Sequence, residues 1–586
     1  MATYRTCDAL VEALRDFGVR YFFSVSGANI EPVHDSIYLY GCRRLISVLA
    51  KHESGAAFMA DAHARVHKTL GVCGSTSGGA MLNLLAGVAE ANAESVPLLA
   101  LVGQPPTSLW GKGAFQDSSG IGRALNAVEL FRQVSKYTGL IHKPDEALAH
   151  LEEAITVSLS GRPGASVLLL PRDVLLSEIP GGKSGSLAIR SYRASSPVDE
   201  KTLGALARTF SQSKRPVLIL GHGVLRSIKH DRIIEFAERH SVPTVVTLSG
   251  KGAFPNRHRL FRGVLSVSGH PTAIRTIAEA DVVFLIGAGL NLMTRAPLGD
   301  ILQGKRLVYI NADDDYIDRI ANPDLKVLGD AGEIISSLLE WLEVDSTPIP
   351  VSLETPIDLD LEQVEPLVLA RKPDDSARHS CTPTSLTMFE AMQALRDIIP
   401  YGAHLLIDAG NAGATACHLL PCPEEGTFAT ALGMGGMGWA VAGSVGAALS
   451  PRDEDPRVTI VITGDGALLM NGNEINTIVA HQLPVIMIVL NNAAHGMCIT
   501  RQTLFFDSRF EAVEYPEVNA EIFARSLGGT LGIHTARVTS PQELREVFSR
   551  FVAEKKPALI DVPVIKDEVP PFTPFLAAAR DLVAMK

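Results

Sequence analysis

The sequence predicts an α/β protein made of three doubly wound, parallel-sheet domains. Short apolar runs recur along the chain, each followed by a turn of small residues and then by a helical pattern, and this rhythm is typical of parallel α/β units. The rhythm fills three blocks, which are separated by polar, proline-rich joints at residues 180–197 and 347–384. A chain of 586 residues is long enough for three large domains.

Each block holds four predicted strands, recognised as short runs rich in Val, Ile and Leu. We expect domains at residues 1–180, 195–346 and 382–570, followed by a tail or lid at 571–586. The predicted strands lie at residues 45–49, 71–75, 98–103 and 167–170 in the first block, at 216–220, 243–248, 281–287 and 306–311 in the second, and at 405–408, 458–463, 485–490 and 558–562 in the third.

Composition excludes several classes of protein. Hydrophobic residues make up 46% and charged residues 20% of the chain, as in a globular protein rather than a disordered one. The net charge is −11 and no block of Lys and Arg occurs, so we expect no nucleic-acid-binding or membrane-binding surface. Seven cysteines without a C-x-x-C pair argue against a disulfide framework or a zinc site, and for a reducing cytoplasm. The first 13 residues do not read as a signal peptide.

One long segment of the third block is uncharged. Residues 429–450 carry no charge over 22 residues, but they are rich in Gly and Ala rather than in Leu and Ile. The length would suffice for a membrane span. The composition instead favours a loop that enters a tightly packed, buried helix.

The strongest signal for chemistry lies in the third block. A β-branched strand ends at Gly464-Asp465-Gly466, a helix predicted at residues 468–481 follows, and the next strand ends at Asn492. Ligands of open α/β sheets bind at the carboxyl ends of the strands, so Asp465 and Asn492 are expected to meet there. With a backbone carbonyl, for which Ala494 is the candidate, they offer hard oxygen donors that suit Mg²⁺ bridging to a phosphate. An ordinary turn is the alternative for the Gly-Asp-Gly triplet alone.

Gly-Asp-Gly followed by Asn-Asn at this spacing resembles the diphosphate–Mg²⁺ motif of thiamine-diphosphate (ThDP) enzymes. Further motifs resemble the acetolactate synthase (acetohydroxyacid synthase) group of that superfamily, and they are spread over nearly the whole chain. The resemblance implies a pyrimidine-binding domain, a central Rossmann-like domain and a diphosphate-binding domain, in that order. The motifs are KHESGAA from residue 51, GVCGSTSGGAMLN from 71, LGMGGMGWAVAG from 432 and HGMCITRQTLFF from 495.

The resemblance implies roles for single residues. Glu53, at the start of an alanine-rich helix predicted at 53–66, matches the glutamate that hydrogen-bonds the aminopyrimidine ring and promotes its imino tautomer, a role suited to a poorly solvated carboxyl group. A solvated carboxylate at a helix start is the alternative. Met437 matches the apolar residue that bends the coenzyme, with a core methionine as the alternative. Gln116 matches a catalytic glutamine that faces the reacting intermediate. Further coenzyme contacts are expected from Asn83, Gly410, Asn411, Asp465, Gly466, Ala467, Asn492 and His495.

Two departures from the family pattern concern the substrate. Where the family has a PGGA turn, this chain reads Ser26-Gly27-Ala28-Asn29, so Asn29 would place an amide beside the substrate. Arg501 stands where the family has a tryptophan that shapes the acceptor pocket. A guanidinium group in that wall favours an anionic or polyoxygenated reactant, unless the side chain points to solvent. These changes put the family's usual substrates in question.

The resemblance implies decarboxylation of a 2-oxo acid, with pyruvate as the expected donor, and transfer of the acyl unit to a carbonyl acceptor. Simple decarboxylases of the superfamily carry adjacent histidines in the loop that corresponds to residues 109–120, which contains none. Carboligation is therefore favoured over release of an aldehyde. Three alternatives stay open: a 2-oxo acid decarboxylase or carbon–carbon lyase, a flavin-dependent oxidase of the same superfamily, and a non-catalytic ThDP-binding relative.

FAD and a second subunit are the remaining implications of the resemblance. Acetolactate synthases bind FAD in the central domain, and Gly221-His222-Gly223 and residues 249–252 resemble the family there. The family's acidic pair is missing from residues 287–295, so FAD binding is left open. Family sites form between the first domain of one subunit and the third of another. We therefore expect a homodimer or homotetramer in which Glu53 and Asp465 of one site belong to different chains.

Overall fold

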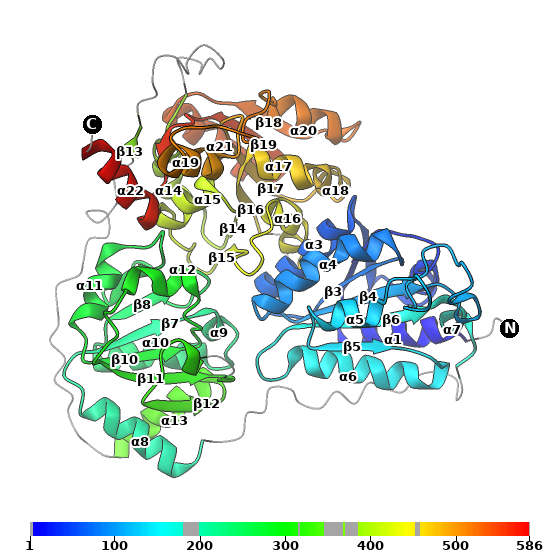
Figure 1. Cartoon of the computed structure of the whole chain (residues 1–586), viewed down its shortest axis with the longest axis horizontal. Helices are drawn as coiled ribbons and strands as arrows, with labels where there is room; N and C mark the ends of the chain where they lie inside the picture. The colour runs from blue at the N-terminus through cyan, green and yellow to red at the C-terminus, as the bar shows by residue number, and fades with distance from the viewer. Residues whose placement is uncertain are drawn as a thin grey trace.

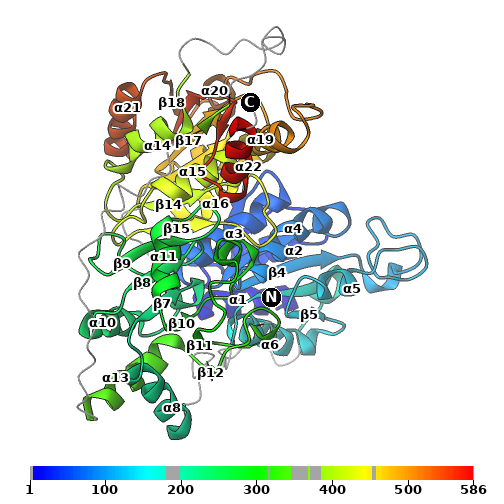
Figure 2. The same cartoon turned by 60° about the vertical axis from the view of Figure 1, so that its left-hand side comes forward.

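The computed structural model describes residues 4–179, 198–314, 317–344, 367–369, 385–451 and 457–584. It contains three six-stranded sheets in which the paired strands run parallel, and this confirms the predicted fold class. The third sheet and its helices lie above the first two units, which stand next to each other (Figures 1 and 2). The joint at 180–197 and most of the joint at 347–384 lie outside the described residues.

The first sheet has the strand order β2-β1-β3-β4-β6-β5. Successive residues of one strand, such as Phe22 and Phe23, belong to two different apolar clusters, because side chains alternate between the two faces of a strand. Helices therefore cover both faces, as in a doubly wound domain. The elements are α1 (Thr6–Phe17), β1 (Tyr21–Ser24), α2 (Glu31–Tyr40), β2 (Ile46–Leu49), α3 (Glu53–His67), β3 (Gly71–Ser75), α4 (Gly79–Ala93), β4 (Leu98–Gln104), α5 (Ala127–Arg132), β5 (Tyr137–Leu140), α6 (Ala147–Leu159), β6 (Ala165–Pro171) and α7 (Arg172–Leu176).

The second sheet has the order β12-β11-β10-β7-β8-β9. Its two faces are also apolar, since Leu218 and Ile219 of one strand lie in separate clusters. The elements are α8 (Glu200–Ser211), β7 (Pro216–Leu220), α9 (His222–Leu225), α10 (His230–His240), β8 (Thr244–Thr247), β9 (Phe261–Leu265), α11 (Pro271–Glu279), β10 (Val282–Ile286), α12 (Leu292–Arg295), β11 (Arg306–Asn311), β12 (Leu325–Leu328) and α13 (Ala331–Val344).

The third sheet has the order β15-β14-β16-β17-β19-β18. One of its faces shares an apolar cluster with the first sheet and the other shares one with the second sheet, so the three units pack into one body. The elements are α14 (Met388–Arg396), β14 (His404–Ile407), α15 (Asn411–Leu419), β15 (Thr427–Thr430), α16 (Trp439–Ala448), β16 (Thr459–Gly464), α17 (Asp465–Asn471), η7 (Gly472–Glu474), α18 (Ile475–Ala480), β17 (Val485–Asn491), α19 (Gly496–Phe505), α20 (Ala520–Gly528), β18 (His534–Arg537), α21 (Pro541–Glu554), β19 (Ala558–Pro563) and α22 (Thr573–Ala584).

The helix predicted at 468–481 is interrupted in the structure. Helix α17 ends at Asn471, one 3-10 turn follows, and α18 begins at Ile475. The turn directs the carboxylate of Glu474 to the first domain, where Glu474 Oε1 accepts hydrogen bonds from the backbone N–H groups of Lys51 (2.9 Å) and His52 (3.1 Å). A contact between domains therefore overrides the local helical pattern.

The uncharged segment at 429–450 forms the expected loop and buried helix. Every residue of α16 is buried, and the helix packs closely on α3. A Cβ atom at Gly446 would lie 1.9 Å from the carbonyl oxygen of Met59, and one at Gly443 would lie 2.9 Å from Ala62 Cβ. The glycines thus permit a close helix contact between the first and third domains. Within the described part of the chain, no helix is long and apolar enough to cross a bilayer.

Three histidines at this same contact predict acid sensitivity. His63, His67 and His404 form a chain of ring contacts with centroids 4.7 and 5.8 Å apart. Burial lowers the pKa values of His63 and His404 to about 3 and that of His67 to about 4, whereas an unfolded histidine titrates near pH ~6.5. A lowered folded-state pKa stabilises the fold above pH ~6.5, and this stability is lost as the pH falls towards the folded-state values.

We therefore expect the free energy of unfolding to fall by on the order of a few kcal/mol between pH ~6.5 and ~4.5. Urea unfolding at a series of pH values measures this dependence. The variant His67→Gln keeps a donor for the carbonyl oxygen of Ala447, which His67 Nε2 contacts at 3.0 Å. Its free energy of unfolding should fall less steeply with falling pH. An equal slope would mean that other groups cause the acid sensitivity.

Candidate active site

Three adjacent strands of the third sheet end at the predicted coenzyme-binding residues. Strands β14, β16 and β17 are neighbours, and β16 and β17 pair up to Gly464 and Leu490. Gly410-Asn411 follows β14, Asp465-Gly466-Ala467 begins α17 after β16, and Asn492 follows β17. The fold thus brings these residues to one edge of one sheet, as the strand pattern predicts.

Asp465 is 2% exposed. Burial raises its pKa to about 6, against the opposing effect of a hydrogen bond from Tyr515. The Tyr515 hydroxyl donates to Asp465 Oδ2 at 2.9 Å, and the Tyr515 ring also contacts the ring of His495, with centroids 5.5 Å apart. Tyr515 lies outside the motifs and 50 residues from Asp465, so no local pattern predicts this contact.

Asn411 and Asn492 lie beside each other at the start of α19. A Cβ atom at Gly496 would lie 2.7 Å from Asn492 Nδ2 and 3.4 Å from Asn411 Nδ2. Asn411 is 4% exposed, and its Oδ1 atom has no hydrogen-bond partner among the described residues. Buried polar atoms are normally paired, so this orphaned amide fits a ligand bound at the strand ends.

The backbone at this edge leaves room for a phosphate group. Gly410 has φ +106°, which favours glycine, and a Cβ atom there would meet nothing within 4 Å. A Cβ atom at Gly466 would lie 2.9 Å from His495 Nδ1, so a larger residue there would have to displace the His495 ring. Ala494 is buried, and its N–H donates to Asn492 Oδ1 at 3.2 Å. Asp465, Asn492 and the carbonyl of Ala494 thus fit a magnesium-bound diphosphate by donor type.

Met437 lies in the loop at residues 431–438, between β15 and α16, and is half-buried. The backbone N–H of Gly438 donates to Asp408 Oδ1 at 2.9 Å, and Asp408 follows β14 directly. A Cβ atom at Gly436 would lie 3.1 Å from the ring of Phe58 on α3. Met437 therefore lies between the first and third domains, beside the strand end that precedes Gly410.

Glu53 begins α3 and belongs to the first domain. Its Oε2 atom accepts a hydrogen bond of 2.9 Å from Asn83 Nδ2, on α4, so two of the predicted residues meet here. The neighbouring Ser54 reaches the third domain, with its Oγ 3.5 Å from Asn471 Oδ1. Asn471 ends the helix that Asp465 begins, and a helix of this length spans roughly 10 Å. Within one chain, Glu53 is thus next to the far end of α17 rather than next to Asp465.

Asn29 and Gln116 each contact the loop that follows β3. Asn29 is 7% exposed and donates from Nδ2 to Ser77 Oγ at 2.8 Å. Gln116 packs over the adjacent Gly78, where a Cβ atom would lie 2.8 Å from Gln116 Cβ. The two predicted substrate residues come from distant segments and are brought to one side of the first domain.

Arg501 lies on α19 and is exposed, and its Nη2 atom is 3.2 Å from Cys498 Sγ. The predicted tail or lid forms the helix α22 up to Ala584. Phe575 and Leu576 of α22 share an apolar cluster with Met497 and Leu504 of α19. The C-terminal helix therefore supports the helix that carries Arg501.

A separate cavity of about 830 Å³ lies between the central and first domains. Its walls include Glu94, Arg162, His222, Ser249, Asn291 and Asp313. The segments Gly221-His222-Gly223 and 287–295 of the central domain meet at this cavity. A Cβ atom at Gly221 would lie 2.2 Å from the carbonyl oxygen of Gly287. His222 Nε2 is buried and has no hydrogen-bond partner among the described residues.

Comparison with known proteins identifies all three domains. The N-terminal TPP binding domain of thiamine pyrophosphate enzymes matches residues 5–121, the central domain matches 203–338 and the C-terminal TPP binding domain matches 408–562. A probable acetolactate synthase large subunit of Methanocaldococcus jannaschii is 28% identical over 97% of this chain and 93% of the relative. An acetolactate synthase of Arthrospira platensis is 29% identical over 96% of this chain and 94% of the relative.

The isozyme 3 large subunit of acetolactate synthase from Escherichia coli is 27% identical, over 93% of this chain and 92% of the relative. The matched domains include the strand ends at Asp465 and Asn492 and the helix start at Glu53. The chain therefore belongs to the thiamine-diphosphate-dependent enzymes and is acetolactate synthase-like.

Proposed function

We propose that this enzyme is a ThDP- and Mg²⁺-dependent carboligase, which decarboxylates a 2-oxo acid and transfers the acyl unit to a carbonyl acceptor. We expect pyruvate to be the donor. The observation that carries the proposal is the meeting of Asn411, Asp465 and Asn492 at three adjacent strand ends. The acetolactate synthase relatives support carboligation.

In this proposal the residues at the edge of the third sheet and those of the first domain have separate tasks. Asp465, Asn492 and the Ala494 carbonyl would hold the metal, and Gly410, Asn411 and Gly466 would line the place of the diphosphate. When bound, ThDP supplies an electron sink for the carbon that loses carbon dioxide. Glu53 holds a proton at the aminopyrimidine ring, while Asn83 orients its carboxyl group. Asn29 and Gln116 bind and orient the reactants.

Product analysis tests the reaction class. The purified protein is incubated with ThDP, Mg²⁺ and pyruvate, with and without added aldehydes or 2-oxo acids, and the products are identified by NMR. We expect a 2-hydroxy ketone product that depends on the acceptor. Free acetaldehyde as the sole product would favour the decarboxylase instead.

We further propose that a second copy of the chain completes the site. In one chain Asn83 is exposed beside Glu53, and the apolar side chains of Leu82 and Met470 are 46% and 53% exposed. A second copy would cover these side chains and bring the Glu53 of one chain to the Asp465 of the other.

Mixing two inactive variants tests this arrangement. Glu53→Gln and Asp465→Ala chains are unfolded, mixed and refolded together. Half of the sites in the mixed dimers contain both wild-type residues if Glu53 and Asp465 come from different chains, so activity should return. No recovery, although mixed dimers form, would place both residues of a site in one chain.

In the same proposal, Arg501 binds an anionic or polyoxygenated reactant. The variant Arg501→Met should lower kcat/KM for an acidic acceptor by about tenfold or more, because a charged hydrogen bond is lost, and should change it little for an uncharged aldehyde. Steady-state kinetics with a matched pair of acceptors measures the difference. Equal losses for both acceptors would mean that Arg501 does not recognise charge.

FAD is a candidate ligand of the cavity between the central and first domains. The cavity volume of about 830 Å³ is that of a small-molecule site, and His222 Nε2 is an unused acceptor on its wall. Flavin released on denaturing the purified protein would show that the protein binds FAD. A flavin-bound protein that reduces dyes with pyruvate would favour the flavin-dependent oxidase.

A further inference from the structure

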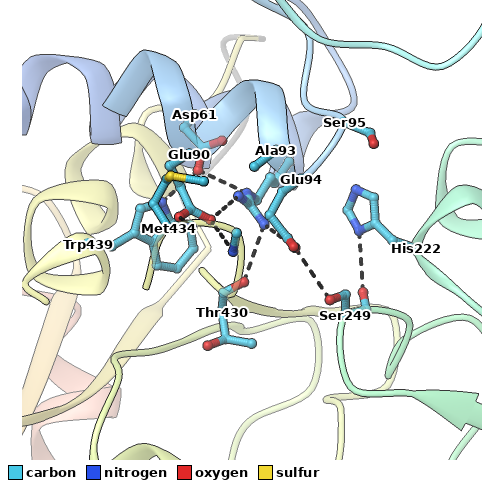
Figure 3. A network of polar contacts seen from close by, with 12 residues as sticks. Asp61, Glu90, Ala93, Glu94, Ser95, His222, Ser249, Thr430, Met434 and Trp439 are labelled. Atoms are coloured by element: carbon cyan, nitrogen blue, oxygen red, sulfur yellow. Dashed lines mark hydrogen bonds and ion pairs between the residues drawn. The ribbon is translucent and has the colours of Figure 1, made fainter. Parts of the chain in front are cut away.

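A buried ionic cluster in the first domain holds both ends of the loop that carries Met437. The cluster consists of Asp61 and Arg65 on α3, Glu90 on α4, and Glu94, the residue directly after α4 (Figure 3). Arg65 Nη1 donates to the carbonyl oxygen of Thr430 at 3.2 Å, directly before the 431–438 loop. Trp439 Nε1, directly after the loop, donates to Asp61 Oδ2 at 2.6 Å.

These two contacts depend on each other. Arg65 Nε donates to Asp61 Oδ2 at 2.9 Å, and the Arg65 guanidinium lies 5.2 Å from the centre of the Trp439 ring. The side chains of Asp61 and Arg65 are 0% and 3% exposed, so water screens the pair little. One ion pair therefore fixes the distance between the two ends of the loop.

Glu90 holds the first half of the loop itself. Its Oε1 accepts from the backbone N–H of Gly433 at 3.1 Å, and its Oε2 accepts from that of Met434 at 2.6 Å. Arg65 Nη2 lies 3.4 Å from Glu90 Oε1. A Cβ atom at Gly433 would lie 2.7 Å from Ala93 Cβ, so the loop backbone is pressed against α4. A carboxylate that accepts two backbone N–H groups fixes them strongly, because each bond is charge-assisted.

The loop then leads directly to the coenzyme edge. Three residues after Met434 comes Met437, and the next N–H group, that of Gly438, is bound by Asp408 at the end of β14. The 431–438 loop is thus fixed at its start by the first domain and at its end by the third sheet. Between these points Met437 has little freedom of position.

We propose that Glu90 is a positioning residue for the coenzyme, which acts by holding the 431–438 loop so that Met437 stands at the third-sheet edge. This inference rests on the proposed function, because the role of Met437 does. Glu90 touches neither the coenzyme nor the reacting atoms in this proposal. Its effect passes through Gly433 and Met434.

Glu94 provides a matched control within the same cluster. It also lies beside Arg65, with Glu94 Oε2 and Arg65 Nη1 3.5 Å apart, but it accepts from Ser249 Oγ of the central domain at 3.3 Å instead of from the loop. Figure 3 shows Glu94 directed to Ser249, while Glu90 is near Met434. Glu94→Gln and Glu90→Gln therefore each remove one carboxyl group from beside Arg65, but only the second removes an acceptor of the loop's own N–H groups.

Hydrogen–deuterium exchange in the absence of coenzyme tests the hold directly. In Glu90→Gln the amides of the 431–438 loop should exchange about tenfold faster or more, because the charged acceptor is lost, while Glu94→Gln should leave them unchanged. Glu90→Asp keeps the charge but withdraws the carboxylate, and it should resemble Glu90→Gln. Equal acceleration in Glu90→Gln and Glu94→Gln would overturn the proposal, because the charge of the cluster would then hold the loop.

Titration with ThDP and Mg²⁺ tests the consequence for the coenzyme. The Kd of ThDP should rise about tenfold in Glu90→Gln and Glu90→Asp, and should change less than about twofold in Glu94→Gln. Unchanged ThDP affinity in both Glu90 variants would overturn the positioning role. A wild-type protein that takes up no ThDP would instead refute the proposed function, while the exchange experiment would still decide whether Glu90 holds the loop.

Discussion

Replacing Glu53 with glutamine should lower the rate of product formation by about 10²- to 10³-fold, the range expected for loss of a proton-transfer group. The coenzyme should still bind, because the residues at the third-sheet edge are untouched. Asn83 Nδ2 now donates to Glu53 Oε2, and a glutamine at position 53 can keep that hydrogen bond through its carbonyl oxygen. The variant thus removes the ionisable group with little change of shape.

Two measurements separate binding from chemistry in this variant. Calorimetry should give a Kd for ThDP within a few-fold of the wild-type value, while NMR should show slower exchange of the coenzyme C2 proton. Glu129→Gln is the control, since Glu129 is 59% exposed in an ion pair with Arg132 on α5 and should retain full activity. A loss of less than tenfold in Glu53→Gln would contradict the assigned role.

Replacing Asp465 with alanine should weaken ThDP binding by about 100-fold or more, which corresponds to roughly 2.7 kcal/mol. Asp465 is the one carboxylate among the three proposed metal ligands, so its loss leaves that set with no negative charge for the metal. The Mg²⁺ dependence of binding should disappear with it. Calorimetric titration with ThDP, with Mg²⁺ and with a chelator, measures both effects.

Two further variants serve as controls for Asp465→Ala. Asp507→Ala removes a carboxylate that is 87% exposed and should leave ThDP binding unchanged. Tyr515→Phe removes the hydrogen bond to Asp465 Oδ2 but no ligand, so we expect a change of about fivefold or less. If Asp465→Ala folds normally and binds ThDP with Mg²⁺ as tightly as the wild type, the metal site lies elsewhere.

The sequence alone predicted the three parallel sheets, because their central strands are fully buried and therefore continuously apolar. Each of the twelve predicted strands corresponds to a strand of the structure. The strands that it missed are the internal strand β1, the short paired strands β13 (Leu367–Val368) and β20 (Glu568–Val569), and five strands at sheet edges, β5, β9, β12, β15 and β18. Edge strands pair on one side only, and β18 is half-buried throughout, so its pattern is weak.

The sequence also located the candidate metal and diphosphate residues, because the carboxyl ends of adjacent parallel strands must share an edge. Asp465 and Asn492 could be placed together from strand pattern alone. Their roles, and those of Glu53, Gln116, Asn29, Arg501 and Met437, stay predictions that the variants above test.

The tertiary structure decided which side chains support that edge. Tyr515 reaches Asp465 across 50 residues, and Glu90 reaches Gly433 across 343. Neither contact belongs to a helix or strand repeat, so no periodicity in the sequence signals it. Local patterns fix where elements begin and end, whereas contacts between elements depend on how whole domains pack. For this protein, the chemistry at the strand ends was therefore readable from the sequence, and the hold on the 431–438 loop was visible only in the folded chain.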